Sequence, residues 1–280
     1  MTASPFVKWA GGKARLLAQY EPHFPASMGR YIEAFVGGGA VFFHLHRQGR
    51  LQGKPVFLMD HLEELINSYR VIQHDVEELI AALAMHDRHK ADADYYYEVR
   101  AWDRATTYAH RTDVERAARF LFLNRVCYNG LYRVNRKGQA NMPFGRHRNP
   151  KVCDAANLRA VHKALQGVTL LVADFEHCLT LAEPGDLVYF DPPYHPLSST
   201  ANFTSYTRRS FGVEEQQRLA QVFRQLDRRG CHVMLSNSAT DLVQELYRDY
   251  PQVTVQAPRP INSDPTKRGA VGELLVKNWR

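Results

Sequence analysis

The chain has 280 residues, of which 45% are hydrophobic and 23% charged, so it is long enough for one large domain with a sizeable insert. The sequence contains no run of about 18 apolar residues and no signal-peptide core, which excludes a membrane-spanning class and predicts a cytoplasmic protein. Its four cysteines are scattered, so neither a disulfide framework nor a metal site is expected, and no obligate protein partner is indicated.

The first segment contains Gly11-Gly12-Lys13, followed by a helical pattern over Ala14–Tyr20. It is not a phosphate loop, because that motif needs Ser or Thr directly after the lysine. What remains is a tight turn that allows a ligand close to the backbone. Trp9 and Lys13 beside this turn offer the ligand an aromatic face and a cation.

A strand, a glycine turn and a helix come next, over Tyr31–Val36, Gly37–Gly39 and Val41–Leu45. A second strand, Pro55–Met59, ends at Asp60, which stands 21 residues after the last glycine of the turn. A carboxylate at about that distance is placed to bind the ribose hydroxyls of an adenosine cofactor.

The glycine pattern also indicates which adenosine cofactor is bound. A dinucleotide fingerprint needs a third glycine where the chain has Phe42, which argues against a pyrophosphate and against a nicotinamide oxidoreductase. S-adenosylmethionine has no phosphates and fits better. Glu33, at the end of the first strand, is expected to accept a hydrogen bond from the cofactor's ammonium group, with a solvated carboxylate as the alternative.

From residue 62 the alternation of strands and helices gives way to helical patterns over Leu62–Leu83, Asp92–Thr107 and Asp113–Arg125. They lead into residues 127–138, where an Asn-Gly pair and a Lys-Gly turn predict a loop and a hairpin. Residues 111–151 hold ten Lys or Arg against two acidic residues. So much charge of one sign predicts a polyanion-binding surface, and a solvated basic face is the alternative.

Basic and aromatic residues are interleaved in this segment in a way that suits duplex DNA. Arg133 is expected to read guanine edges in the major groove, and Tyr128 to fill the stack opened by a displaced base. The remaining basic residues are expected to contact phosphates and so to position the duplex without reading it: Arg136, Lys137, Arg146 and Arg148.

Alternation resumes after Asp154 with a helix to Leu165 and a strand over Val168–Val172. Asp174 and Phe175 follow this strand and are expected to contact the cofactor's adenine, with core packing as the alternative for Phe175. Further strands are predicted over 187–190, 231–235, 252–257 and 272–279, with a helix at 213–227 and a polar, aromatic loop at 201–206 that would cap an active site.

These elements predict an α/β fold with a doubly wound, Rossmann-like sheet of seven mostly parallel strands. Residues 1–61 and 154–280 are expected to form the domain that binds the cofactor and catalyses the reaction. Residues 62–153 are expected to form an inserted, mainly helical DNA-recognition domain that carries the hairpin.

The strand over Leu187–Phe190 ends abruptly at Asp191-Pro192-Pro193-Tyr194. Because prolines have no amide hydrogen, the carbonyls of Asp191 and Pro192 are expected to remain free as acceptors. The Asp191 carboxylate and the Pro192 carbonyl suit the two hydrogens of an exocyclic base amine, with the Tyr194 ring stacked on the base. An ordinary Asp-Pro turn is the alternative.

Over nearly its whole length, the chain resembles the DNA adenine methyltransferases of the Dam type. The order of cofactor motif, recognition insert and catalytic motif is similar to that of the alpha group of amino-methyltransferases. Small departures are Cys127 and Tyr132 in the recognition stretch and His195 after the catalytic motif. The resemblance rests on these motifs: Phe6–Lys13, Glu33–Gly39, Leu123–Arg125, Tyr128–Leu131, Asn141–Arg146, Asp191–Tyr194 and Ala201–Thr204.

This resemblance implies transfer of a methyl group from S-adenosylmethionine to the exocyclic amino group of adenine, within GATC in duplex DNA, by base flipping. A methyltransferase of the same fold that acts on RNA or protein glutamine, or a non-catalytic DNA-binding module, is the alternative. The implied catalytic residues are Asp191, Pro192 and Tyr194. Those implied for the cofactor are Trp9, Lys13, Gly37, Gly39, Asp60 and Asp191, and those for DNA are Lys8, Tyr128, Asn129, Leu131, Arg133 and Pro143. Asn135, in the predicted hairpin, is also expected to contact DNA.

Overall fold

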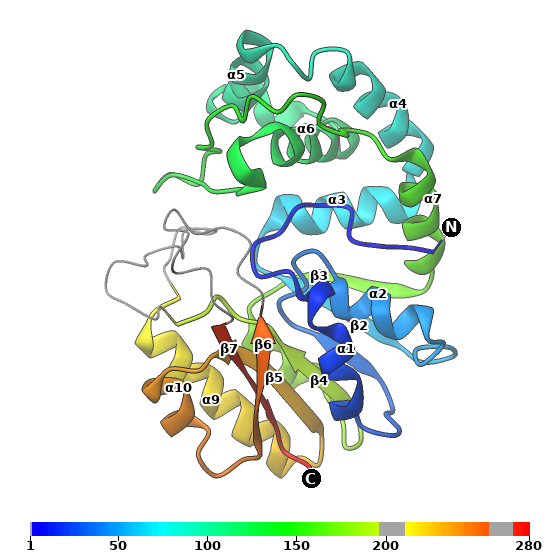
Figure 1. The fold of residues 1–280 in the computed structure, drawn as a ribbon. Coiled ribbons are helices and arrows are strands. Elements are labelled where there is room, and N and C mark those ends of the chain that lie inside the picture. Colours follow the sequence, from blue (N-terminus) through cyan, green and yellow to red (C-terminus); the bar gives the residue numbers. More distant parts are fainter. Residues whose placement is uncertain (1, 196–210, 258–270) are drawn as a thin grey trace.

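The computed structural model describes residues 2–195, 211–257 and 271–280 (Figure 1). Its centre is a seven-stranded sheet in the order β3-β2-β1-β4-β5-β7-β6, in which β7 runs antiparallel to both of its neighbours and the other neighbouring pairs are parallel. The predicted seven-stranded, mostly parallel sheet is therefore confirmed. The strands are β1 Tyr31–Glu33, β2 Val56–Asp60, β3 Val168–Val172, β4 Leu187–Phe190, β5 His232–Ser238, β6 Gln252–Ala257 and β7 Val271–Lys277.

Helices cover both faces of this sheet, because side chains along a strand point alternately to its two faces. Tyr31 and Tyr189 belong to one buried cluster with residues of α2 and α3, whereas Ile32 and Val188 belong to a second cluster with residues of α9. The helices are α1 Leu17–Tyr20, α2 Ala40–Arg47, α3 Glu63–His74, α4 Val76–Asp87, α5 Ala93–Ala101, α6 Asp113–Val126, α7 Ala155–Ala164, α8 Cys178–Leu181, α9 Val213–Arg228 and α10 Asp241–Leu246.

Helices α4, α5 and α6 form a layer above the sheet, and α3 lies between them and the strands (Figure 1). Helix α3 contacts β2 and β3 on one side and α6 on the other. Although α3 falls inside the expected insert, it therefore also covers the sheet, and one hydrophobic cluster runs through both parts. The division of the chain at residues 62 and 153 stays a prediction. No helix of the described residues is long and apolar enough to cross a membrane.

Several boundaries differ from those that the sequence pattern predicts. Strand β1 ends at Glu33, after which the chain turns at Gly37 with a φ of +47°. The single helix expected over 62–83 is two helices, because Asp75 leaves the helical region with φ −128° and ψ 39°. The apolar period continues across this bend, so the pattern alone does not reveal it. In place of a hairpin ladder, residues 127–144 contain two isolated bridges, Cys127 with Phe144 and Val134 with Ala140.

Candidate active site and DNA-binding segment

Polar residues follow the carboxyl ends of the parallel strands along one edge of the sheet. In spatial order they are Asp174 after β3, Asp60 at the end of β2, Glu33 at the end of β1, and Asp191 after β4, with Ser236 in β5. Parallel strands bring these ends together, although Glu33 and Asp191 lie far apart in the sequence. This edge is where open α/β sheets bind their ligands.

One oxygen of the Asp191 carboxylate is fully engaged. Its Oδ1 lies 2.7 Å from Lys13 Nζ and accepts a hydrogen bond of 2.9 Å from Ser236 Oγ. No group of the described residues donates to Asp191 Oδ2 or to the Pro192 carbonyl. Among the described residues these two acceptors at the end of β4 therefore have no donor, and their contact with a bound molecule stays a prediction.

Lys13 occupies the centre of this site, with 2% of its side chain exposed. Its ammonium group donates to Gly11 O at 2.6 Å, lies 4.6 Å from the centre of the Tyr194 ring and lies 4.0 Å from Glu273 Oε1. The lysine thus contacts the Asp191 carboxylate directly. Sequence reasoning assigned it to the cofactor only.

Two polar residues of the site, Ser236 and Glu273, were missed by sequence reasoning. Glu273 lies in β7, is buried, and accepts a hydrogen bond from the Tyr20 hydroxyl. Burial raises the pKa of its carboxyl group, and nearby Lys13 opposes that shift. A signal was present in the sequence, because each of these polar residues interrupts or ends an apolar strand pattern.

The turn after Asp191 is held from behind by buried amides. Gln216 of α9 donates to the Pro193 carbonyl at 3.0 Å and accepts from Asn237 Nδ2 at 3.0 Å. Asn237 also accepts from the His195 backbone amide at 3.2 Å. Because Gln216 and Asn237 are both 0% exposed, the turn is fixed by hydrogen bonds that water does not weaken.

The glycine turn after β1 is shaped by contacts that leave no room for a side chain. A Cβ on Gly37 would lie 2.5 Å from Trp9 Nε1, and one on Gly39, whose φ is +70°, would lie 2.7 Å from the Tyr69 hydroxyl. The Gly37 amide donates to Asp60 Oδ2 at 3.1 Å. The turn, the indole of Trp9 and the predicted ribose-binding carboxylate therefore form one cluster.

Glu33 is buried at the end of β1 and accepts a hydrogen bond of 2.8 Å from the Tyr31 hydroxyl. Burial raises the pKa of the Glu33 carboxyl group to about 8, against the effect of the Tyr31 hydrogen bond. The solvated carboxylate considered as its alternative is therefore wrong. Its contact with a cofactor stays a prediction.

Asp174 and Phe175 follow β3 at the same edge of the sheet. Arg218 of α9 donates to Asp174 Oδ2 at 2.8 Å, and the Arg218 guanidinium lies 4.2 Å from the centre of the Phe175 ring. Phe175 is 3% exposed and stacks on Phe35 with ring centres 5.6 Å apart. The described contacts are thus those of core packing for Phe175, and its predicted contact with adenine stays a prediction.

The site fits a positively charged ligand such as S-adenosylmethionine. Three carboxyl groups, those of Glu33, Asp191 and Glu273, lie at this edge, and Lys13 contacts two of them. Burial raises the pKa values of Glu33 and Glu273, and a bound cation would favour the ionised form of both, so these carboxyl groups and a cationic ligand would stabilise each other. The glycine turn beside them provides backbone that a ligand can approach closely.

Residues 127–150, which are predicted to bind DNA and are called the DNA-binding segment below for that reason, have a firmly held backbone. Asp103 accepts from the Ala140 amide at 2.7 Å, and Arg104 donates to the Ala140 carbonyl at 2.8 Å. Arg119 of α6, whose side chain is 2% exposed, pairs with Asp103 at 2.8 Å. Arg100 donates to the Met142 carbonyl at 2.8 Å. The backbone of the segment at Ala140 and Met142 is thereby fixed to the helices.

Most of the side chains of this segment that are predicted to contact DNA are, in contrast, exposed. Tyr128 is 58% exposed, and Asn129 after it has a φ of +57°. Arg133 donates through Nε to the Asn141 carbonyl at 2.9 Å, and no hydrogen bond of the described residues uses its two terminal nitrogens. Other exposed members are Arg136, Lys137, Pro143, Arg146 and Arg148, and Leu131 is partly buried.

Other residues of this segment make contacts within the protein. The Asn135 side chain accepts from the Lys137 and Gln139 amides at 2.9 Å and 3.0 Å, so it shapes the turn. Cys127 and Tyr132, which depart from the family pattern, are 0% and 4% exposed and pack in the core. Their contact with a DNA base is therefore excluded in this conformation.

The basic residues of the range 111–151 form two groups, one before and one after the end of α6. Before that point, Arg111 pairs with Glu115 at 3.0 Å, Arg116 pairs with Glu64 at 2.9 Å, and Arg119 is buried as described. After it, the basic side chains of the DNA-binding segment are exposed. The surface available to a polyanion is therefore smaller than the predicted range of 111–151.

A family model describing the D12 class N6 adenine-specific DNA methyltransferases matches residues 9–261, which is most of the chain and includes Asp191–Tyr194. The chain belongs to this family. It is therefore a site-specific, adenine-specific DNA methyltransferase, and the enzymes of this family use S-adenosylmethionine.

Three relatives of this methyltransferase match it over all or nearly all of their length. The type II methyltransferase M.MjaIII of Methanocaldococcus jannaschii is 42% identical, with all of both chains covered. The type II methyltransferase M1.LlaDCHI of Lactococcus lactis subsp. cremoris is 41% identical over 98% of this chain and 95% of the relative. The DNA adenine methylase of Escherichia coli K12 is 35% identical over 97% of this chain and 94% of the relative.

Proposed function

We propose that this methyltransferase modifies the exocyclic amine of an adenine that is flipped out of duplex DNA, within the sequence GATC. The observation that carries the catalytic part is the arrangement at Asp191. Lys13 and Ser236 hold Oδ1, and this leaves Oδ2 and the Pro192 carbonyl as two acceptors beside the Tyr194 ring. Two acceptors next to an aromatic face match the two hydrogens and the plane of an adenine amine.

The chain's own groups act on the amine. When bound, S-adenosylmethionine supplies a methyl carbon made electrophilic by its positively charged sulfur. The adenine nitrogen is a weak nucleophile, because its lone pair is delocalised into the ring. By accepting hydrogen bonds from its two N–H groups, Asp191 and the Pro192 carbonyl would draw that lone pair out of the ring and stabilise the positive charge that develops on nitrogen. The N–C bond forms as the C–S bond of the methyl donor breaks, and the nitrogen then loses one of its two protons.

Base flipping follows from where these acceptors lie. A reacting base must leave the stack to reach acceptors at the edge of a buried sheet, which costs a few kcal/mol of stacking and pairing. Stacking on Tyr194 offsets part of this cost. Tyr128, at the start of the DNA-binding segment, is 58% exposed, which supports the proposal that it enters the gap in the duplex.

The target sequence rests on the resemblance to the Dam type together with the exposed reading groups. Arg133 is anchored through Nε, so its two terminal nitrogens suit the O6 and N7 acceptors of guanine. Lys8, Leu131 and Pro143 complete the proposed reading set. Asn129 enters the duplex with Tyr128, and the exposed arginines at 136, 146 and 148 contact phosphates.

We assign cofactor binding and catalysis to residues 1–61 and 154–280 and target recognition to residues 62–153, with α3 serving both parts. Gly37 contacts both Trp9 and Asp60, and these three residues form the proposed cofactor surface together with Lys13. The held backbone of the DNA-binding segment supports its role in recognition.

One experiment tests the proposal. The protein is incubated with labelled S-adenosylmethionine and plasmid DNA, and the product is digested with a nuclease that methylation at GATC blocks. We expect labelled N6-methyladenine and protection at GATC. Methyladenine without protection would refute the target sequence alone. Label in RNA or protein glutamine, and none in duplex DNA, would refute the whole proposal.

A further inference from the structure

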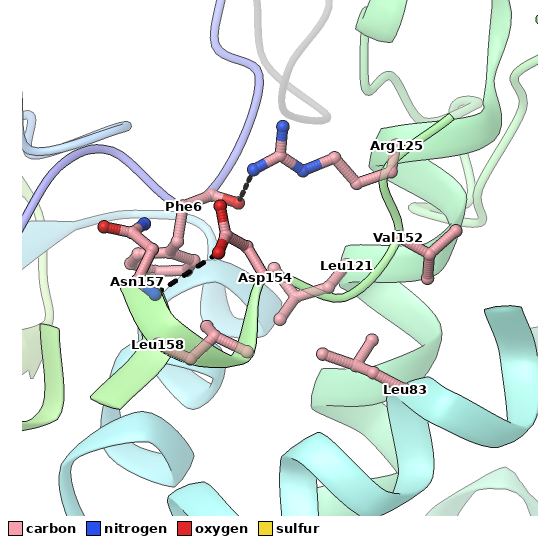
Figure 2. A pocket seen from close by; sticks show the side chains of 8 residues that line it. All are labelled: Phe6, Leu83, Leu121, Arg125, Val152, Asp154, Asn157 and Leu158. Atoms are coloured by element: carbon pink, nitrogen blue, oxygen red, sulfur yellow. Dashed lines mark hydrogen bonds between the residues drawn. The ribbon is translucent and has the colours of Figure 1, made fainter. Parts of the chain in front are cut away.

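The N-terminal segment, residues 4–8, is attached at every second residue by side chains from the helices. Asn157 of α7 exchanges hydrogen bonds of 3.1 Å and 3.0 Å with the backbone of Ser4. Arg125 donates a hydrogen bond of 2.7 Å to the Phe6 carbonyl. Figure 2 shows this bond at a small cavity that Phe6, Arg125 and Asn157 help to line. Asn124 makes the third attachment, at Lys8.

Asn124 binds Lys8 as a neighbouring strand would. Its Oδ1 accepts from the Lys8 amide at 2.8 Å, and its Nδ2 donates to the Lys8 carbonyl at 2.8 Å. The same Nδ2 lies 3.4 Å from the Gly130 carbonyl. Because Asn124 is 0% exposed, these bonds are shielded from water. One amide therefore joins the N-terminal segment to the loop over Tyr128–Leu131.

The loop over Tyr128–Leu131 also contacts the side chain of Lys8 directly. Gly130 has a φ of +65°, and a Cβ at this position would lie 2.4 Å from Lys8 Cδ and 2.8 Å from Lys8 Cβ. The aliphatic part of Lys8 thus lies directly on the Gly130 backbone. The next residue, Trp9, packs against the Gly37 turn, so the same short segment reaches the proposed cofactor surface.

We infer that Asn124 is a positioning residue for target recognition, which fixes Lys8 relative to the loop that enters the duplex and connects both to the cofactor side of the site. This inference rests on the proposed function, since it takes Lys8 and Tyr128 as DNA-contacting groups. Asn124 itself touches neither DNA nor the reacting atoms. Its loss should lower the enzyme's discrimination between sequences more than its binding of S-adenosylmethionine.

The chain offers a matched control for this test. Asn157 makes the same pair of bonds to the backbone of Ser4, is also buried, and does not contact the loop. Asn157→Ala therefore removes the same pair of backbone bonds from the segment as Asn124→Ala, and with it the bond of 3.0 Å that Ser4 Oγ donates to Asn157 Oδ1. Gly130→Ala disturbs the contact between the loop and the Lys8 side chain and leaves Asn124 in place. It replaces Asn124→Ala in the experiment if Asn124→Ala does not fold.

Initial rates are measured on the sequence that the wild-type enzyme methylates and on the same duplex with one base pair changed. S-adenosylmethionine affinity is measured by calorimetry. For Asn124→Ala and Gly130→Ala, we expect the ratio of the two rates to fall roughly tenfold, the scale of one lost base-reading contact, with cofactor affinity within about twofold of wild type. Asn157→Ala should keep the wild-type ratio while losing as much thermal stability as Asn124→Ala.

Equal loss of discrimination in Asn124→Ala and Asn157→Ala would overturn the inference, because the effect would then be structural. An unchanged ratio in Asn124→Ala or, if that variant does not fold, in Gly130→Ala would also overturn it. Failure of the proposed function is recognised separately, since the wild-type enzyme would then show no preferred sequence on which to compare the variants.

Discussion

The edge of the sheet and the DNA-binding segment fix their functional groups in opposite ways. At the sheet edge, polar side chains are buried and hold one another, as Lys13 and Ser236 hold Asp191. In the DNA-binding segment, buried groups such as Asp103 hold the backbone, and Arg133 remains exposed. Catalysis needs a dry site in which charges are strong, whereas sequence reading needs side chains that reach a solvated groove from a rigid base.

Removing the carboxylate at the sheet edge should produce the largest effect. We expect Asp191→Ala to lower kcat by roughly a hundredfold or more, because an acceptor organised for the transition state is lost. DNA affinity, measured by fluorescence anisotropy, should stay near that of the wild type, since the DNA-binding segment is untouched. Near-full turnover in this variant would refute the proposed role of Asp191.

The DNA-binding segment should respond in specificity. Arg133→Ala is expected to cost about 1–3 kcal/mol of discrimination at one base pair, as measured by kcat/KM on matched and single-mismatch duplexes. Arg148→Ala should instead weaken binding to all sequences alike and reduce its salt dependence. If both variants changed matched and mismatched duplexes by the same factor, the division into reading and phosphate contacts would be wrong.

A smaller effect is expected from the hydroxyl behind the catalytic carboxylate. Ser236→Ala should lower kcat roughly fivefold, because one hydrogen bond to a charged group is lost while Lys13 still holds the same oxygen. KM for DNA should not change. Ser68→Ala removes another buried hydroxyl, which donates within α3 at 2.8 Å, and serves as the control with unaltered kcat.

The buried carboxyl of Glu33 should affect stability and its pH dependence rather than the rate of the reaction. Its pKa of about 8 in the fold lies above the ordinary value of 4.5, so stability is fully present at low pH and falls as pH rises toward 8. The slope from this group is at most about 1.4 kcal/mol per pH unit. Glu33→Gln should flatten the decline of Tm between pH 5 and pH 8, and an unchanged decline would contradict the shift.

Much of the sheet and part of the site could be predicted from short stretches of sequence. The apolar run at 187–190 identifies a strand buried on both faces, and the two prolines after it stop the ladder and free a carbonyl. The glycine turn before α2 and the carboxylate of Asp60 were recognised by their spacing, and they are in contact in the structure. These features depend on backbone rules that neighbouring residues satisfy among themselves.

The contacts around Asp191 could not be predicted in the same way. Lys13, Asp191 and Glu273 come from the beginning, the middle and the end of the chain, and only the order of strands brings them together. The role of each basic residue could not be predicted either, because the residues that pack beside a basic side chain decide whether it pairs within the protein or remains exposed. Arg119 is buried against Asp103, whereas Arg133 faces solvent.

The sequence by itself determined the strands, the glycine turn, the acceptor-rich end of β4 and the position of the basic segment, since local sterics and apolar periodicity settle these. Only the tertiary structure decided that Lys13 and Ser236 hold Asp191, that Asn124 joins Lys8 to the loop at Gly130, and that helix α6 uses its arginines internally. The physical reason is that burial and charge pairing depend on contacts between elements that are distant in the chain, and a local sequence pattern does not show which of these elements meet.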